Sequence, residues 1–291
     1  IPTDTINIHI DKDALLRSGI MLPKTIRHLK GEDLKDAIPD KLYIPLTDIR
    51  MLTKVDLLML EMLANCNWER PLYLAISVGS VSKLKFDNYF VQEGLAFRFT
   101  PFDYKKWGDV GENRLYAVDV ERLYDNVMNR YKYGGLDTPG LYLDETTLRT
   151  CWYHRRLFAQ LAKELIAQGD NERAKKVLAY AEQVIPGYNV PETHESGSYD
   201  IATAYAALGE KTKAVTLAVH LIAEAEDYIN WAFSLKGNRI EMVRNDCIYK
   251  FWQWNQYNEL LKKIDGEKYK ESNRRFEEKY ALFAPTMNYK N

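Results

Sequence analysis

The chain has 291 residues, of which 46% are hydrophobic and 28% charged, and its 40 basic and 41 acidic side chains leave a net charge of −1. This length suits two domains or one large one, and the composition excludes disordered, collagen-like and low-complexity proteins. No excess of basic residues is available to attract phosphate backbones, so we expect no nucleic-acid partner.

Neither the cysteines nor the apolar runs indicate a special compartment. Cys66, Cys151 and Cys247 are too scattered for a disulfide framework or zinc pairs, and we interpret them as core residues. No run of 18 apolar residues occurs, so we expect no direct membrane insertion by this chain. Because it begins at Ile1 without an initiator Met, we expect it to be cut from a longer protein.

The first half predicts short strands and helices. Residues 41–46 predict a strand, with Pro45 placing it at an edge or an end. Thr53 predicts the N-cap of an apolar helix that runs to about Cys66. Residues 70–78 are rich in β-branched and aromatic side chains and predict a buried strand. Strand, helix and strand in this order predict a right-handed βαβ unit.

Sequence patterns typical of strands occur once more after residue 78 and are absent from the second half of the chain. Residues 95–101 predict a strand, and residues 118–131 predict a helix that is stopped at Gly134. We therefore predict an α+β fold, with a small mixed α/β layer over residues 1–143 followed by an all-α helical stack over residues 144–291.

An internal repeat marks the second half. Gly169 and Gly209, each expected at a turn between helices, are 40 residues apart, and so are the packing residues Ala174 and Ala214. This pattern resembles the tetratricopeptide repeat, whose usual period is about 34 residues. We place the extra residues in a polar connection over 187–195.

The C-terminal part predicts further helices over residues 228–235 and 242–264, without a legible third copy of the repeat. We expect these helices to cap the stack. The chain also has 20 tyrosines and six tryptophans. This aromatic content suits either a carbohydrate or peptide platform or half-buried packing between helices.

Sequence motifs for common enzyme classes are missing. The chain has no P-loop, dinucleotide fingerprint, His-Glu-x-x-His helix or Gly-x-Ser-x-Gly elbow, so we expect no cofactor and no metal. We interpret residues 194–196, a His-Glu-Ser run, as a solvated loop. Asp137, Asp144 and Glu145 either cap a helix that starts near residue 146 or form an acid–base site at the domain junction.

Two aromatic positions are candidates for ligand contact. Trp68 and Arg70 lie in a dense run and together can anchor a sugar ring, a peptide or a neighbouring domain, or can form a packed lid with Arg70 paired to a carboxylate. Tyr205, in the second copy of the repeat, is a candidate for a concave binding face.

Several runs carry a resemblance to a known family, namely residues 67–73, 93–98, 124–128, 134–137 and 139–144. They resemble the C-terminal extracytoplasmic region of large bacterial multi-spanning membrane proteins similar to protein O-mannosyltransferases, over most of residues 40–220. The resemblance implies a parent that is a lipid-linked-sugar-dependent glycosyltransferase. It also implies that the catalytic acidic residue lies in the parent's N-terminal half, so no catalytic residue is assigned here.

We therefore expect a non-catalytic interaction or substrate-presenting domain at the periplasmic face of the inner membrane. Its expected partners are its own membrane-spanning half, a partner protein or a glycan acceptor. Two alternatives stay open: a hydrolase or transferase with carboxylates at the domain junction, and a free-standing glycan- or peptide-binding protein. The candidate binding residues are Trp68, Arg70, Asp137, Asp144, Glu145 and Tyr205.

Overall fold

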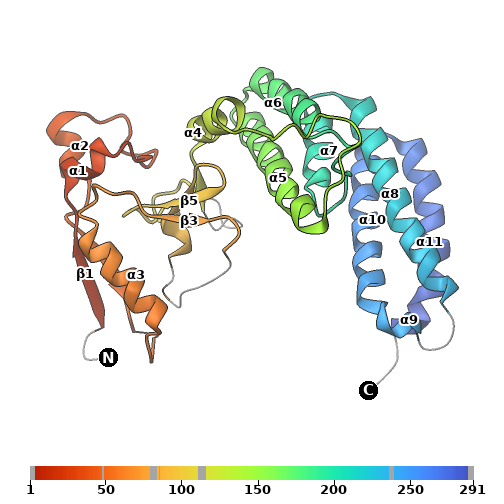
Figure 1. The fold of residues 1–291 in the computed structure, drawn as a ribbon, viewed down its shortest axis with the longest axis horizontal. Coiled ribbons are helices and arrows are strands. Elements are labelled where there is room, and N and C mark those ends of the chain that lie inside the picture. Colours follow the sequence, from red (N-terminus) through yellow and green to blue (C-terminus); the bar gives the residue numbers. More distant parts are fainter. Residues whose placement is uncertain are drawn as a thin grey trace. The chain divides into compact units, whose positions relative to one another are not determined.

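The structure, a computed structural model, describes residues 4–47, 49–78, 84, 86–110, 116–235 and 239–287. The backbone divides into two compact units, Ile1–Arg130 and Tyr131–Asn291, which we call the N-terminal unit and the helical unit. The first holds two small sheets with short helices, and the second holds packed helices (Figure 1). The predicted fold class is thereby confirmed. The predicted boundary near residue 143 falls within the helical unit, just before its first long helix.

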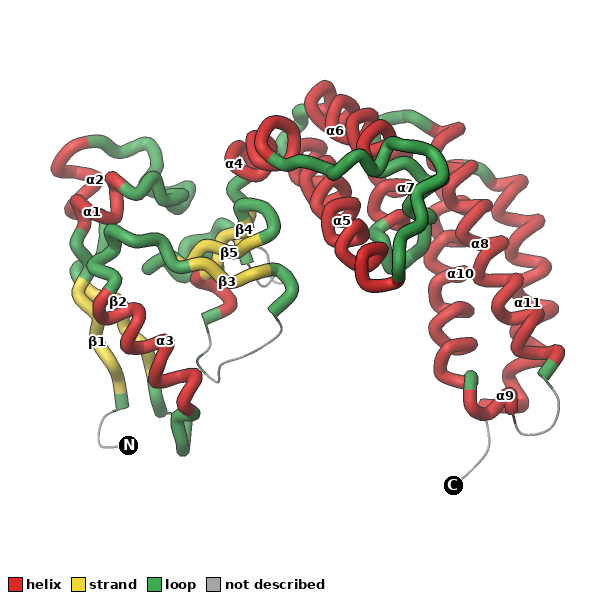
Figure 2. Tube along the Cα trace, in the orientation of Figure 1, coloured by secondary structure: helices red, strands yellow, loops and turns green. Residues whose placement is uncertain are grey.

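The N-terminal unit mixes strands with short helical segments (Figure 2). Its sheets are a two-stranded one in the order β1-β2 and a four-stranded one in the order β3-β5-β4-β6. The elements are β1 (Thr5–His9), α1 (Lys12–Arg17), α2 (Gly31–Ala37), β2 (Lys41–Pro45), α3 (Lys54–Asn65), β3 (Tyr73–Ala75), the 3₁₀ helix η1 (Asp87–Tyr89), β4 (Phe90–Gln92), β5 (Ala96–Phe99), β6 (Ala117–Val118), α4 (Val120–Asp125) and the π-helix η2 (Asn126–Arg130).

The two-stranded sheet follows from alternating side chains. β1 and β2 pair antiparallel, with Ile8 opposite Leu42 and both side chains buried. The intervening residues point outward, as the period of a strand requires. The predicted strand at residues 41–46 is confirmed, and Pro45 lies at its last position.

The predicted βαβ unit is wrong. β2 and β3 flank α3 in the sequence but belong to different sheets, because β2 takes β1 as its antiparallel partner and β3 takes β5. The strand predicted over residues 70–78 is also shorter and more exposed than expected. β3 has only one neighbour in the four-stranded sheet, so it is an edge strand, and Tyr73 is 49% exposed.

The apolar helix predicted after Thr53 is confirmed. α3 begins with a capping box, in which the Thr53 hydroxyl accepts a hydrogen bond from the Asp56 N–H and the Asp56 carboxylate accepts one from the Thr53 N–H at 2.7 Å. Such a cap satisfies backbone groups that have no partner within the helix. α3 ends at Asn65, with Cys66 as its C-cap, as the sequence predicts.

The helical unit consists of paired helices that pack in succession. α5 contacts α6 and α7, α7 contacts α8, α8 contacts α10, and α10 contacts α11. The bounds are α5 (Glu145–Ala167), α6 (Asn171–Val184), α7 (Ser198–Ala207), α8 (Lys211–Ser234), α9 (Arg239–Met242), α10 (Arg244–Ile264) and α11 (Gly266–Met287).

The two turn glycines end α5 and α7 with the same geometry. Gly169 and Gly209 have φ angles of +80° and +78°, a left-handed conformation that favours glycine. At each turn, the glycine N–H and the following N–H donate to carbonyls in the last turn of the helix, which is the Schellman arrangement. These bonds are Gly169–Ile166 and Asp170–Leu165 in the first turn, and Gly209–Ala206 and Glu210–Tyr205 in the second.

Positions that are 40 residues apart are also buried alike. Ala174 and Ala214 are both 0% exposed, and so are Ala162 and Ala202. The polar connection predicted over residues 187–195 lies between α6 and α7, as expected. The sequence did not predict α11, which pairs with α10 and completes a third helical hairpin.

Candidate functional site

Trp68 is a core residue of the N-terminal unit. It is 6% exposed, its ring stacks near Phe99 with centroids 6.4 Å apart, and its indole N–H donates to the His9 carbonyl at 2.7 Å. Asn67 and Trp68 both have positive φ, at 49° and 59°. This conformation costs roughly 1–2 kcal/mol for each non-glycine residue. The packing of the indole therefore holds the chain in a strained bend.

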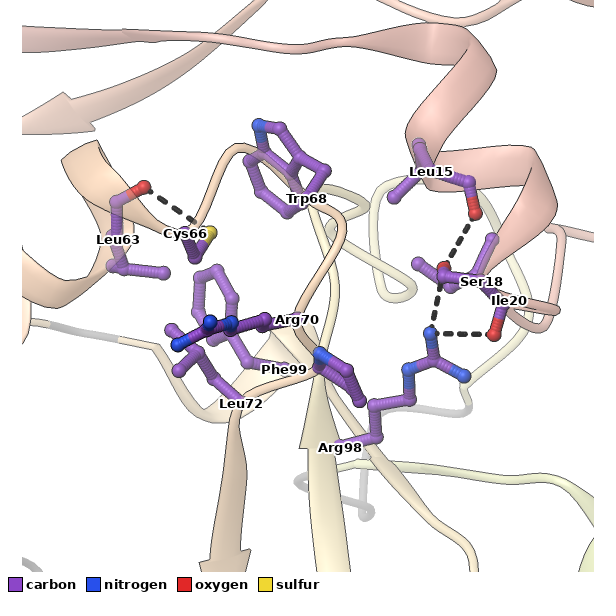
Figure 3. Close-up of a pocket in the computed structure, with 11 residues that line it drawn as sticks. Leu15, Ser18, Ile20, Leu63, Cys66, Trp68, Arg70, Leu72, Arg98 and Phe99 are labelled. Atoms are coloured by element: carbon purple, nitrogen blue, oxygen red, sulfur yellow. Dashed lines mark hydrogen bonds between the residues drawn. The ribbon is translucent and has the colours of Figure 1, made fainter.

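A small cavity lies beside this bend and is lined by Trp68, Arg70 and Arg98 among others (Figure 3). Its volume of about 10 Å³ suits one water molecule and is far too small for a sugar or a peptide. Arg70 is exposed, and among the described residues no carboxylate lies within ion-pair distance of its guanidinium. The interpretation in which Arg70 pairs with a carboxylate is therefore not supported by the described residues.

A buried charge network next to the cavity was not predicted. The Glu93 carboxylate lies 2.8 Å from the Arg122 guanidinium and 3.6 Å from that of Arg98, and it accepts a hydrogen bond from the Tyr73 hydroxyl at 2.8 Å. Arg98 also donates to the Ser18 carbonyl at 2.9 Å, which ties β5 to the end of α1. Both Glu93 and Arg98 lie in the run 93–98 that carried the family resemblance. Their pairing gives that run a structural role.

The carboxylates near residue 144 act at the start of α5. Asp144 is the N-cap, and its carboxylate accepts hydrogen bonds from the N–H groups of Thr146 and Thr147 at 2.9 and 3.1 Å. The Thr147 hydroxyl also donates to it, and this bond, with those from the backbone, lowers the pKa of Asp144. Glu145 pairs with Arg149 at 2.5 Å. The hydrogen bonds of Asp144 thus give it the capping role, which was one of the two roles expected for it.

Asp137 is exposed and contributes its backbone. Its carbonyl accepts a hydrogen bond from the Tyr188 hydroxyl at 2.6 Å. The neighbouring Asn189 amide donates to the carbonyls of Leu136 and Thr138 at 2.7 and 2.6 Å. The segment around Asp137 is thus fastened to the connection between α6 and α7.

Replacing Asp144 tests its capping role. We expect Asp144→Ala to lower the melting temperature of the helical unit by roughly 2–4 °C, because two N–H groups of α5 lose their acceptor. Asp144→Asn is the matched control, since asparagine caps as well as aspartate. Melting followed by circular dichroism distinguishes them. Equal destabilisation by both variants would show that the negative charge, and not the cap, is what matters.

Tyr205 is buried between helices of the helical unit. It is 6% exposed, its hydroxyl donates to the Glu182 carboxylate of α6, and Lys213 of α8 lies 5.0 Å above its ring. Burial and the bond to Glu182 raise its pKa well above the ordinary value. Tyr205 thus links α6, α7 and α8, and only a small part of its side chain is open to a ligand.

The connection between α6 and α7 is not the solvated loop that we predicted. Ser196 is 0% exposed, and the guanidinium of Arg155, itself 3% exposed, donates to the Ser196 hydroxyl at 3.2 Å. Arg155 also donates to the carbonyls of Ile185, Val190 and Pro191. The connection is therefore wrapped around one buried cation, which the sequence did not reveal.

His194 lies among four aromatic rings, which the sequence did not predict. Its imidazole centroid is 5.3–6.1 Å from the ring centroids of Tyr199, Tyr249, Trp252 and Tyr257. The Tyr257 hydroxyl is 2.9 Å from His194 Nδ1. Burial lowers the pKa of His194, so the imidazole is neutral at neutral pH. The connection and α10 thereby form one aromatic cluster.

The cysteines are free, and groups suited to a metal are scarce. Cys151 and Cys247 are buried and Cys66 is partly buried, and burial raises the pKa of the first two thiols. Within the residues that the structure describes, no three histidine, cysteine or acidic side chains are grouped as metal ligands would be.

Together these observations define the class of protein: a mixed α/β domain with two small sheets and a buried charge network, followed by paired helices. Residues 1–121 match the family model described as TMEM260-associated domain 2. TMEM260 is a family of multi-span membrane proteins similar to O-mannosyltransferases. Over residues 40–121, where this match overlaps the resemblance drawn from the sequence, the predicted similarity to multi-spanning membrane proteins is confirmed. Most of the N-terminal unit is thus similar to a domain associated with a membrane glycosyltransferase-like family.

Searches of the curated proteins and of the solved structures found no significant match to this chain. In the part of the chain that the structure describes, every helix is too short or too polar to cross a bilayer.

Proposed function

We propose that this chain is a non-catalytic accessory region of a membrane glycosyltransferase-like protein, on the extracytoplasmic, periplasmic side of the inner membrane. In this role the N-terminal unit contacts the membrane-spanning part of the same protein. The helical unit, as a tetratricopeptide-like stack, presents a surface to an acceptor. The observation that carries the proposal is the match of residues 1–121 to a domain associated with TMEM260.

A surface of the matched segment supports a contact role. Helix α3 buries Leu60 and Leu63 on one side, but it also exposes apolar residues on another. A helix that is apolar all round is normally buried on all sides. We call the α3 apolar face a set of residues that are 43–65% exposed, namely four residues of the helix and Met51, which lies just before it: Met51, Val55, Leu57, Leu58 and Met62.

The α3 apolar face suits an apolar partner. Val55, Leu58 and Met62 are three and four residues apart, so they lie along one side of the helix. Contiguous exposed apolar patches mark sites of protein or membrane contact. The proposed occupant is the membrane-spanning part of the same protein, because the matched domain is associated with a family of multi-span membrane proteins.

The helical unit and the carboxylates support the non-catalytic part of the proposal. Asp144 and Glu145 are engaged in capping and in the ion pair with Arg149. The equal spacing and equal geometry of the Gly169 and Gly209 turns favour a stack of hairpins, which is an architecture used for binding extended partners.

The reading frame upstream of the codon for Ile1 gives a direct test of the proposed parent. We expect several long hydrophobic segments there, followed by the present chain on the outer side, where added protease reaches it in spheroplasts. A reading frame with a lone secretory leader would contradict the proposal and favour a free-standing protein.

A photo-cross-linker at position 58 tests the contact. In the full-length protein in its membrane, we expect the cross-linker at Leu58 to join the membrane-spanning part and one at Glu32 of α2 not to do so. Leu58→Glu is expected to weaken the association of the two parts by about 10–100-fold, because burial of a leucine side chain is lost. Lys54→Ala, on the same helix, is the matched control. Cross-links of equal yield from positions 58 and 32 would overturn the proposed contact.

A further inference from the structure

We propose that the helical unit binds a neutral saccharide on a platform formed by Tyr249 and Trp252 of α10, with Glu195, Glu224 and Lys250 along its edge. This inference names a ligand class for the proposed accessory function. It relies on the proposed function only in expecting the sugar to come from a glycosylated acceptor. The platform includes no residue of the α3 apolar face, so the two proposals can be tested separately.

The platform consists of two half-exposed rings. Tyr249 and Trp252 are one helical turn apart, and their rings stack on each other with planes 13° apart and centroids 5.6 Å apart, so each ring covers part of one face of the other. They are 43% and 48% exposed, so ring surface remains open to solvent. Flat aromatic surfaces of this kind match the apolar C–H face of a pyranose and offer contact area at a low entropic cost.

His194 packs edge-on against both rings of the platform. Its imidazole meets the Trp252 ring nearly edge-on, at 5.3 Å and 76°, and the Tyr249 ring at 6.1 Å and 86°. The His194 ring is fixed in turn by the hydroxyl of Tyr257, a residue that is 0% exposed. Rings that are already ordered lose little freedom when a ligand binds, which favours affinity.

Charged side chains supply the polar contacts that a sugar needs. Lys250 lies 3.8 Å from the Glu224 carboxylate, and these side chains are 15% and 39% exposed. The Gln253 amide donates to one oxygen of Glu195 at 2.8 Å. The Glu195 carboxylate also accepts a hydrogen bond from its own backbone N–H, and its remaining lone pairs can accept a bond from a sugar hydroxyl.

The charges of the side chains beside the platform favour a neutral ligand. Two carboxylates face one ammonium group, so an anionic ligand such as a phosphosugar or an acidic peptide is disfavoured. Carboxylate and ammonium groups beside flat rings suit a neutral ligand with many hydroxyl groups. A proline-rich peptide also binds aromatic surfaces, but it offers few donors to the carboxylates.

Titration of the whole chain with neutral trisaccharides tests the proposal. The probes are maltotriose, cellotriose and mannotriose, and the readout is the set of indole N–H signals in the NMR spectrum. We expect saturable movement of the Trp252 signal at millimolar sugar. The signals of the buried Trp68 and Trp254 are expected to stay in place, and they are internal controls in the same sample.

Two variants identify the groups responsible. Trp252→Ala and Glu224→Ala are each expected to weaken binding by about 10-fold or more, as loss of a central contact usually does. Tyr280→Ala is the matched control. Tyr280 lies in α11 and not in α10, is 40% exposed, and stacks on Phe276 of its own helix with ring centroids 5.6 Å apart. It should leave binding unchanged, and so should Leu58→Glu in the N-terminal unit.

The possible results of these experiments distinguish failure of the saccharide proposal from failure of the proposed function. No movement of the Trp252 signal with any trisaccharide overturns the proposal, whatever the variants do. Movement with a proline-rich peptide but with no sugar overturns it in favour of a peptide site. Saccharide binding that survives in Trp252→Ala shows that the sugar lies elsewhere. Failure of the Leu58 cross-link with saccharide binding intact would contradict the proposed function alone.

Discussion

Replacement of Glu93 by glutamine is expected to destabilise the N-terminal unit by about 3–5 kcal/mol, because it leaves a buried guanidinium without its counter-charge. The side chains of Glu93 and Arg98 are 6% and 3% exposed. Glutamine has nearly the same shape as glutamate, so the expected loss of stability comes from removing the negative charge. Arg122 loses its shorter ion pair at the same time, since it lies 2.8 Å from the same carboxylate, and it keeps the longer one to Asp119 at 3.9 Å.

Hydrogen exchange measured by mass spectrometry is the appropriate readout for Glu93→Gln, because it reports on the two units of the chain separately. We expect faster exchange in β4 and β5 and in the end of α1, which Arg98 joins to the sheet. Glu32→Gln is the control: Glu32 is 83% exposed and pairs weakly with Lys35, so a change within about 0.5 kcal/mol is expected. A similar small effect of Glu93→Gln would show that the network is dispensable.

Replacement of Arg155 by methionine is expected to destabilise the connection between α6 and α7 by about 3–5 kcal/mol. The guanidinium is the donor for three backbone carbonyls and the Ser196 hydroxyl. Each buried acceptor that loses its donor costs roughly 1–3 kcal/mol. Methionine fills the volume of the side chain, so the effect measures lost hydrogen bonds and not a cavity. Lysine should not rescue the loss, because one ammonium group cannot reproduce the fork of a guanidinium.

Exchange in residues 185–197 is the measurement for Arg155→Met. Because His194 lies in that connection, the NMR signal of Trp252 should shift in the same variant, even without a ligand. Arg149→Met is the control, since Arg149 is 64% exposed and pairs only with Glu145 of the same helix in the described contacts. Unchanged protection of residues 185–197 would contradict the role given to Arg155.

Features that depend on local chemistry could be predicted from the sequence. The Thr53 cap, the end of α3 and the turns at Gly169 and Gly209 each follow from one or two residues and their immediate neighbours. The 40-residue spacing was visible because glycine and alanine are required at those places for backbone and packing reasons. These are properties that a single sequence shows directly.

Features that depend on distant partners could not be predicted. The βαβ unit was wrong because the partner of β2 is β1, some 30 residues earlier in the chain, and nothing within β2 specifies that choice. α11 was missed because its sequence is mostly polar, and its packing against α10 became visible only in the structure.

The candidate site residues show the same difference between what local sequence predicts and what depends on distant partners. Trp68 and Tyr205 were identified as aromatic candidates, but their burial depends on Phe99 and on Glu182, which are far away in the sequence. The burial of Arg155 and His194 was missed for the same reason. A charged residue in a helix and a histidine in a polar loop are usually exposed, and their burial arises only when α5, the connection and α10 come together.

The paired turns have a consequence for how the number of helical hairpins in such a chain can change during evolution. In the described part of the helical unit, the backbone hydrogen bonds outside the helices join residues at most five positions apart, so no bond ties one hairpin's backbone to the next. Gene duplication or loss of a 40-residue segment would therefore break no backbone–backbone hydrogen bond between described hairpins. The four-stranded sheet lacks this freedom, because removal of an inner strand would leave its neighbours with unpaired edges.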